Sequence, residues 1–254
     1  MLKPRLTAIA HILKDHLNPY TKRLTFATGA ALVAGIVAAA SVTGTAIARS
    51  ADFGVGQEAG SYTYGLDVSH YEPLYNWAAS PAQFGIIKAT EGVDFRDASF
   101  ARHWQELGKK GIVRGAYHYG HPAGDPIAEA NYFLSTVNAQ PAKPGDLLVL
   151  DLETTDGKSV PEVNAWAKTW LSYVKAKTGV APMFYSSWRF ANIYGHGLSD
   201  YPLWVAHYGK EKGTVTPPAD WKTWTIHQYS ESPIDQNVST LTPDQLRDLG
   251  RPAV

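Results

Sequence analysis

Two carboxylates stand two residues apart in the segment LLVLDLETTDG (147–157), at the end of an apolar run. In an extended strand, residues two apart point to the same face, with Cα atoms about 6.5–7 Å apart. Asp151 and Glu153 are therefore expected to share one face, with Leu152 on the other. Two neighbouring carboxylates resist ionising together, so the pKa of one of them rises. A carboxyl that stays protonated near neutral pH can act as a general acid while its ionised partner stabilises a developing cation, as cleavage of a glycosidic bond requires.

The Asp-x-Glu pair alone leaves other interpretations open, because such a pair can also bind a cation, cap a following helix or be solvated. Two further acids favour a catalytic site. Asp67 stands in GLDVSH at the end of a first strand-like run, and Asp235 stands in PIDQNV, a last short run. If these runs are strands of one barrel, the four carboxylates converge on one rim.

Strand-like and helix-like segments alternate along the chain after residue 61. Near-continuous apolar runs, typical of strands covered on both faces, predict strands over 62–69, 84–90, 112–120, 147–153, 181–187, 202–208, 223–229 and 233–238. Apolar periodicity and end signals predict helices over 97–111, 126–139, 159–179, 188–195 and 242–250. The helix over 159–179 has the clearest pattern, with a capping box at its start and an apolar stripe that consists of Val163, Trp166, Ala167, Trp170, Leu171 and Val174.

This order of elements predicts an α/β fold, namely an irregular (β/α) barrel similar to a TIM barrel. Full helices are expected mainly in the first half, because the linkers of the second half are short. We expect a single catalytic domain over 62–254, and the sequence contains no internal repeat or appended module.

The amino-terminal segment is interpreted as a leader rather than as part of this domain. Residues 1–23 carry five basic residues and one acid, whereas residues 24–48 carry no charge and end in Ala46-Ile47-Ala48. This pattern predicts a signal peptide over 1–48, a linker over 49–61 and a secreted, extracellular protein of the cell wall without stable membrane contact after cleavage. The alternative is an uncleaved membrane anchor, because 24–48 is long enough to span a bilayer.

Charge and composition exclude several other classes of protein. Of 23 Lys and Arg five lie in 1–48, and of 23 Asp and Glu one does, which leaves 18 basic and 22 acidic residues and a net charge of −4. A nucleic-acid partner is therefore not expected, because such proteins usually carry a basic face. The chain has no cysteine, and its histidines form no tight metal-binding pair, so neither a metal nor another cofactor is expected. We expect a monomer.

Seven segments, taken in order, resemble the family 25 glycoside hydrolases, which are secreted lysozymes of the N-acetylmuramidase type. The segments are GLDVSHYE with a Trp at 77, GIIKATEG, GIVRGAYHYGHP, LLVLDLETTDG, MFYSSWRF, LWVAHYG and HQYSESPIDQN. Together they span about residues 64–238, which is nearly the whole predicted domain.

The resemblance implies a deep groove and cleavage of the β-1,4 bond between N-acetylmuramic acid and N-acetylglucosamine in peptidoglycan glycan strands. It implies that Glu153 is the general acid. Asp151 would stabilise the ring formed when the substrate's own 2-acetamido group attacks the anomeric carbon, and Asp67 and Asp235 would complete the acidic floor. The matched positions that tend to line the groove and bind substrate are Tyr117, Tyr119, Tyr185, Trp204 and Gln228.

Lys88 ends the second predicted strand in KATEG and is a further candidate for the rim. It either binds substrate there or pairs with Glu91, which stands three residues later. The residue types leave both interpretations open.

The sequence departs from the family pattern near its last acid. Only Glu231-Ser232-Pro233-Ile234 separate HQYS from Asp235, where the family usually has a longer loop, and Gln236 stands where an apolar residue is common. The role of Asp235 is therefore the least secure of those that the resemblance implies. A non-catalytic glycan-binding protein on the same fold remains an alternative hypothesis, and a metal-dependent enzyme acting on the same polymer is a third.

Overall fold

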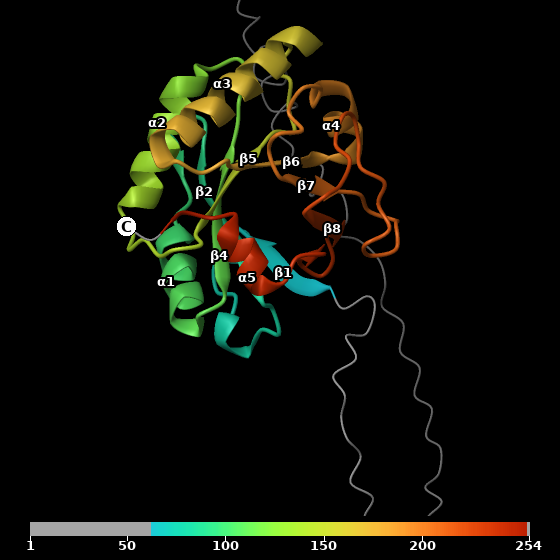
Figure 1. Cartoon of the computed structure of the whole chain (residues 1–254). Coiled ribbons are helices and arrows are strands. Elements are labelled where there is room, and N and C mark those ends of the chain that lie inside the picture. Colours follow the sequence, from blue (N-terminus) through green and yellow to red (C-terminus); the bar gives the residue numbers. More distant parts are fainter. Residues whose placement is uncertain (1–61, 253–254) are drawn as a thin grey trace, which may run out of the picture. The chain divides into compact units, whose positions relative to one another are not determined.

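The computed structural model describes residues 62–252 of the chain (Figure 1). The predicted signal peptide over 1–48 and the linker over 49–61 lie outside these residues, so both stay predictions. None of the helices within 62–252 has the length and apolar character needed to cross a membrane.

Nine strands form one sheet in the described part of the chain, and eight of them close into a barrel. The strands are β1 (Thr63–Val68), β2 (Phe84–Glu91), β3 (Phe95–Arg96), β4 (Val113–Tyr119), β5 (Leu147–Asp151), β6 (Met183–Ser187), β7 (Leu203–Ala206), β8 (Ile226–Ser230) and β9 (Asp235–Ser239). Parallel pairing runs from β1 through β2 and β4 to β8, and β9 closes the barrel as an antiparallel strand between β8 and β1. The short β3 pairs with the end of β2. The predicted irregular α/β barrel is confirmed.

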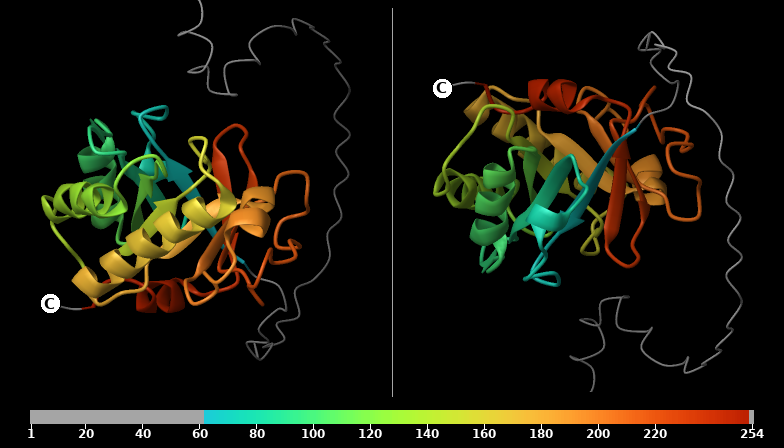
Figure 2. Two further views of the ribbon diagram at one scale, coloured as in Figure 1. Left: turned by 90° about the horizontal axis from the view of Figure 1, so that it is seen from above. Right: turned by 90° about the horizontal axis from the view of Figure 1, so that it is seen from below.

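All five predicted helices are present, with ends that differ by a few residues from the prediction. They are α1 (Phe100–Lys110), α2 (Pro126–Asn138), α3 (Val160–Thr178), α4 (Trp188–Tyr194) and α5 (Pro243–Asp248), and the 3-10 helix η2 (Trp77–Ala79) follows β1. The three longest helices lie together against the first half of the barrel (Figures 1 and 2). Loops without a helix connect β7 to β8 and β8 to β9, in agreement with full helices mainly in the first half, although the β7–β8 loop over 207–225 is longer than the expected short linkers.

The helix α3 illustrates how local signals and packing agree. Glu162 accepts a hydrogen bond from the backbone N–H of Ser159 at 2.8 Å, and Gly179 ends the helix in the left-handed region at φ 74°. The six residues of the predicted apolar stripe are all buried. The helix is therefore positioned by the face that its sequence pattern predicts.

Side chains of β5 alternate between the barrel interior and the layer beneath the helices. Leu148, Leu150 and Leu152 belong to the core between barrel and helices, whereas Leu147 and Val149 belong to the core inside the barrel. The same alternation points the next interior position, Asp151, above this interior core. The apolar run thus holds the carboxyl group on a rigid, packed base.

Neighbouring strands repeat this arrangement. On β2, Phe84 and Ile86 fill the interior core before Lys88, and on β8 Ile226 does so before Gln228. Because interior positions recur every second residue, polar side chains at the strand ends form a layer above the apolar one. Most of the predicted site residues lie in this polar layer.

The antiparallel strand β9 places Asp235 in this polar layer. Asp235 begins its strand rather than ending it, and it lies directly opposite Asp67 in the β1–β9 register. Because β9 runs against β1, its first residue reaches the rim where the parallel strands end. The prediction that Asp235 shares a rim with Asp67 is confirmed. The antiparallel direction of β9 was not part of that prediction.

Candidate active site

The four predicted acids meet at the rim formed by the carboxyl ends of the parallel strands. Asp67 and Asp151 are buried, Asp235 is half-buried and Glu153 is exposed. The strand that carries the Asp-x-Glu pair is shorter than predicted, because β5 ends at Asp151. The backbone N–H of Leu152 still donates to the carbonyl of Tyr185 at 3.0 Å, so the chain stays attached to β6 up to the residue before Glu153.

Asp67 is held by two side-chain amides. Its Oδ1 accepts hydrogen bonds from Gln228 Nε2 at 2.9 Å and from Asn237 Nδ2 at 2.6 Å. Both donors are neutral, so the carboxyl group is oriented by its partners without any cation among these bonds. Such bonds favour the ionised form, although less strongly than a paired cation would.

A second tier of donors fixes these two amides. Tyr185 Oη and Tyr208 Oη donate to Gln228 Oε1 at 2.8 and 2.6 Å, and Trp204 Nε1 donates to Asn237 Oδ1 at 2.8 Å. Each amide oxygen is thereby occupied by donors, which leaves each NH₂ group facing Asp67. The network orients Asp67 from four different strands and one loop.

Trp204 and Gln228 lie beneath the rim surface, since each is only 1 % exposed. Their visible contacts are with Asn237, Asp67 and tyrosines, so the structure places them as supports of the acidic floor. Their predicted contact with a substrate stays a prediction.

Asp151 is the acid with the least support from hydrogen bonds. Its Oδ1 is buried and has no hydrogen-bond partner within residues 62–252. Burial raises the pKa of Asp151 well above its usual range, the negative charge of Glu153 adds to the rise, and the cation of Lys88 opposes it. Asp151 therefore holds a proton far more readily than an ordinary aspartate.

Burial also raises the pKa of Glu153, although its side chain keeps a surface open to solvent. The neighbouring hydroxyl of Tyr185 and the charge of Lys88 work in the opposite direction. Because the charge of Glu153 raises the pKa of Asp151, the protonation states of the two carboxyl groups depend on each other.

The opposed pair of β1 and β9 behaves similarly. Burial raises the pKa of Asp67 to about 7 and that of Asp235 to about 8, and the charge of Asp67 contributes to the rise at Asp235. The pKa values of this second pair thus lie near physiological pH, and burial raises the pKa of both members of the first pair. Clusters of this kind are typical of catalytic sites.

Aromatic side chains and one lysine line the same layer. Burial raises the pKa values of Tyr117 and Tyr119 well above their usual range, and the charge of Asp151 adds to both rises. Both phenols therefore stay protonated and can donate hydrogen bonds. Lys88 Nζ lies 5.2 Å from the ring centre of Tyr119 and pairs with Glu91 Oε2 at 2.6 Å. Of the two interpretations left open for Lys88, the pairing with Glu91 is present, and contact of Lys88 with a substrate stays a prediction.

Within the described residues, no group of three or more His, Asp or Glu side chains is arranged to hold a metal ion. The carboxylates of the rim are instead spaced by tyrosines and amides. The four carboxyl groups of the rim can therefore hold and release protons beside a buried negative charge.

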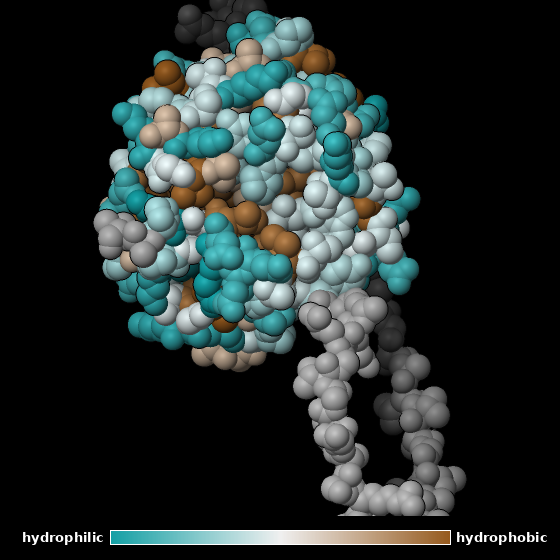
Figure 3. Space-filling model, in the orientation of Figure 1, coloured by the Kyte–Doolittle hydropathy of each residue, from teal (hydrophilic) through white to brown (hydrophobic). Residues whose placement is uncertain are grey.

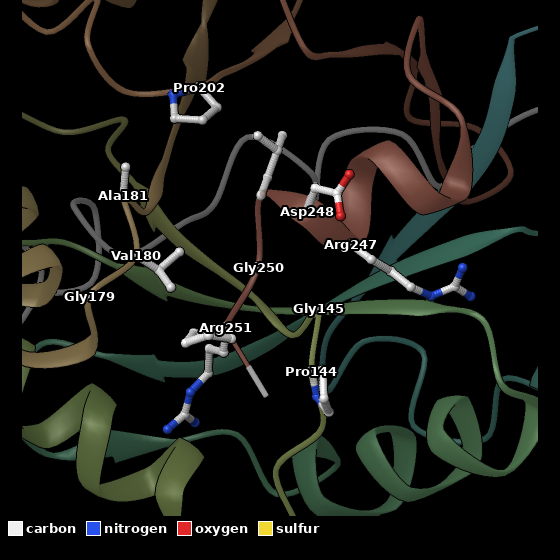
Figure 4. Close-up of a pocket in the computed structure, with 12 residues that line it drawn as sticks. Pro144, Gly145, Gly179, Val180, Ala181, Pro202, Arg247, Asp248, Gly250 and Arg251 are labelled. Carbon is white, nitrogen blue, oxygen red and sulfur yellow. The ribbon is translucent and has the colours of Figure 1, made fainter. Parts of the chain in front are cut away.

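A separate cavity of about 570 Å³ lies at the opposite end of the barrel (Figure 4). It is lined by the segments that precede β5, β6 and β7 and by the residues that follow α5, among them Gly145, Val180, Pro202 and Arg251. The helix α5 lies toward the viewer in Figures 1 and 3, and apolar side chains gather in the middle of this otherwise hydrophilic face. No acid of the four lines this cavity, so it is distinct from the candidate active site.

A model of glycosyl hydrolases family 25 matches residues 66–238. The chain belongs to this family. It is therefore a glycoside hydrolase, and the matched range includes all four acids of the rim.

Curated relatives are about one third identical to this family 25 chain over the aligned residues. Uncharacterized protein YegX of Escherichia coli K12 is 34 % identical over 207 residues, covering 74 % of this chain and 73 % of its own. Lysozyme M1 of Streptomyces globisporus is 33 % identical over 184 residues, covering 65 % of this chain and 61 % of its own. N,O-diacetylmuramidase of Arthroderma benhamiae is 32 % identical over 215 residues, covering 78 % and 88 %.

Solved structures agree with the fold. A family GH25 lysozyme from Aspergillus fumigatus superposes with a TM-score of 0.69 at 29 % identity, covering 75 % of this chain and all of that one. A bacterial lysozyme from Streptomyces coelicolor gives 0.67 at 30 % identity, covering 74 % and 97 %.

Two residues of the site escaped the sequence analysis. Asn237 stands two residues after Asp235 and therefore shares its face, a signal that was present in PIDQNV. Tyr208 lies in the loop after β7 and donates to Gln228 across 20 positions, and no local pattern indicates that contact.

Proposed function

We propose that this family 25 glycoside hydrolase is an exported lysozyme that cleaves the β-1,4 bond between N-acetylmuramic acid and N-acetylglucosamine in peptidoglycan. The observation that carries the proposal is the pair formed by buried Asp151, which has an oxygen without a partner among the described residues, and exposed Glu153, because the pKa of each carboxyl group is raised. The names of Lysozyme M1 and of the N,O-diacetylmuramidase among the relatives support the same substrate.

In the proposed mechanism Glu153 is the general acid. Its carboxyl proton passes to the glycosidic oxygen as the bond to the anomeric carbon breaks, and the oxygen of the substrate's 2-acetamido group forms a bond to that carbon. The positive charge of the resulting ring falls beside Asp151, whose carboxylate stabilises it. Water then attacks the anomeric carbon, the bond between this carbon and the acetamido oxygen breaks, and a proton of the water passes to Glu153, which restores the acid.

The location of the shared proton follows from the unpartnered oxygen of Asp151. Without substrate, burial favours the protonated form of Asp151. A substrate N–H directed at Oδ1 stabilises the ionised form instead, because hydrogen bonding to a carboxylate lowers its pKa. The retained proton then resides on Glu153, where the reaction needs it.

Export is part of the proposal and rests on the leader-like pattern of residues 1–48. We propose that the released enzyme is monomeric and keeps no stable contact with the membrane. A mature amino terminus near Arg49 on protein collected from the medium is the expected result, and an intact amino terminus in the membrane fraction contradicts it.

Digestion of purified peptidoglycan tests the activity. The expected products carry new reducing ends on muramic acid, identified by mass spectrometry, from both O-acetylated and de-O-acetylated material or from the latter alone. Glycan binding without any new reducing end would instead establish the non-catalytic alternative.

A further inference from the structure

A histidine beside the acid pair has a carboxylate at each of its ring nitrogens. His121 follows β4, and its Nε2 lies 3.1 Å from Glu91 Oε1 while its Nδ1 lies 3.2 Å from Asp156 Oδ2. A neutral imidazole carries one N–H and can donate to only one of these acceptors. Both bonds form together only when His121 is an imidazolium.

The surroundings of His121 favour that cation. The charged and titratable groups that face it come from β2, the turn after β2, β4, α2 and the loop after β5, and they are Lys88, Glu91, Asp94, His118, Tyr119, Glu129 and Asp156. The hydrogen bond with Glu91 is the largest cause that raises the pKa of His121, and partial burial opposes it. Carboxylates outnumber cations around the ring, so the geometry and the charges agree.

The hydrogen bond of His121 Nδ1 with Asp156 holds the loop that begins at Glu153. Asp156 adopts a left-handed backbone with φ 47°, which is uncommon for a residue other than glycine. Its carboxylate accepts hydrogen bonds from Thr154 Oγ1 at 2.9 Å and from the backbone N–H of Ala123 at 3.3 Å, in addition to His121. Such a conformation persists only where surrounding contacts fix it.

The hydrogen bond of His121 Nε2 with Glu91 connects the histidine to Lys88, the cation of the site. Glu91 accepts from His121 through one oxygen and from Lys88 Nζ through the other, the latter at 2.6 Å. The charge of Lys88 acts in turn on Asp151 and on Glu153. The alternating row Lys88, Glu91, His121 and Asp156 therefore connects the ends of β2 and β4 with the loop after β5.

We propose that His121, as an imidazolium, is a positioning residue that holds Glu153 and Lys88 in their places at the rim. Loss of its proton leaves one ring nitrogen without an N–H, so one carboxylate loses its bond and the loop after Glu153 loses an anchor. The kinetic consequence rests on the proposed lysozyme function, whereas the protonation state of His121 does not.

Titration of the full-length chain by NMR tests the protonation state directly. The expected midpoint of His121 lies above the ordinary histidine value of about 6.5, and Asp156→Asn lowers it because the variant removes one negative charge. Asparagine tolerates the left-handed backbone, so the variant keeps the shape of the loop. A midpoint of His121 at or below the ordinary value, or one unmoved by Asp156→Asn, overturns the proposal.

Kinetics at about pH 5, below the ordinary histidine pKa, test the positioning role. His121→Gln mimics the neutral ring and is expected to lower kcat by about tenfold to a hundredfold with little change in KM, since small displacements of catalytic groups have effects of this size. His121→Arg keeps a cation that can reach two carboxylates and is expected to retain kcat within about threefold of wild type. The positioning role is contradicted if kcat of His121→Gln equals that of wild type, or if kcat of His121→Arg is no higher than that of His121→Gln.

His196 supplies the matched control. It also pairs with a carboxylate, since its Nδ1 lies 3.0 Å from Asp220 Oδ1, but both side chains are exposed, and they lie in the segments that precede β7 and β8, at the other end of the barrel. His196→Gln should leave kcat unchanged. If wild-type protein has no activity on peptidoglycan, the proposed function fails while the NMR titration still decides the state of His121.

Discussion

The two ends of the barrel both bury aspartates, but they treat the charge in opposite ways. At the base, buried Asp146 accepts hydrogen bonds from Arg114 Nε at 2.6 Å and Nη2 at 3.0 Å, and from the backbone N–H of Lys143 at 2.7 Å. At the rim, buried Asp151 leaves one oxygen without a partner among the described residues, and Asp67 has only neutral amides on Oδ1. A buried aspartate thus has a cationic partner and satisfied oxygens at the base, whereas at the rim it lacks a cationic partner or leaves an oxygen without a hydrogen bond.

The difference separates stability from reactivity. A bidentate arginine neutralises a buried carboxylate and satisfies its oxygens, which secures the loop before β5. Without such a partner, burial raises the proton affinity of the rim acids, which makes them useful for proton transfer at the expense of stability. Single substitutions at each end test whether the base aspartate serves stability and the rim acids serve catalysis.

The largest effect is expected for Glu153→Gln. The amide keeps the shape of the side chain but cannot donate an acid proton, so the rate of peptidoglycan hydrolysis should fall by about 10²–10⁴-fold. Thermal unfolding should change little, because the side chain is exposed. The control Glu106→Gln, in an exposed pair with Arg102 on α1, should keep full activity, and an unchanged rate in Glu153→Gln rules out this residue as the acid.

At the base, Asp146→Asn should have the largest effect on stability. It leaves the buried guanidinium of Arg114 without its counter-charge, which is expected to lower the free energy of unfolding by about 3–5 kcal/mol. Urea denaturation measures the loss, and the rate per folded molecule should stay that of wild type. The exposed Asp244–Arg247 pair is the comparison, since Asp244→Asn should change stability by less than about 1 kcal/mol.

Asp151→Asn should show the reverse behaviour. The rate should fall by about a hundredfold, because the amide cannot provide the negative charge that stabilises the cationic ring. The free energy of unfolding should stay the same or rise, because no buried charge remains at that position. Loss of both activity and stability in this variant would show that the rim acid is structural, as Asp146 is.

The last prediction concerns the pH dependence of stability set by Asp67. Its pKa rises from an ordinary value of 3.8 to about 7 on folding, so the folded state holds this proton more tightly. The stabilisation is complete below about pH 4 and is lost as the pH rises to about 7, with a slope of at most about 1.4 kcal/mol per pH unit. Asp67→Asn should flatten this part of the stability curve and lower the pKa of Asp235, and equal slopes in variant and wild type contradict the assignment.

Much of the fold was predictable because the signals are local. The capping box and apolar stripe of α3, and the alternation Leu147, Val149, Asp151 on β5, require only the periods of helix and strand. The direction of β9 was not predicted, although only residues 231–234 separate it from β8, which is enough for an antiparallel hairpin but too short for a parallel crossover. The position of Asp235 was therefore predicted correctly, but its orientation in the strand was not.

The candidate site likewise has features that the local sequence predicts and features that only tertiary contacts decide. Residue types and a spacing of two determined that Asp151 and Glu153 share a face and can share a proton. Only the tertiary structure decided which acids have partners, because Asn237 reaches Asp67 across 170 positions and His121 reaches Asp156 across 35. The sequence alone specified the acids and the strands that carry them, whereas barrel closure set their protonation by deciding which side chains replace water around each carboxyl group.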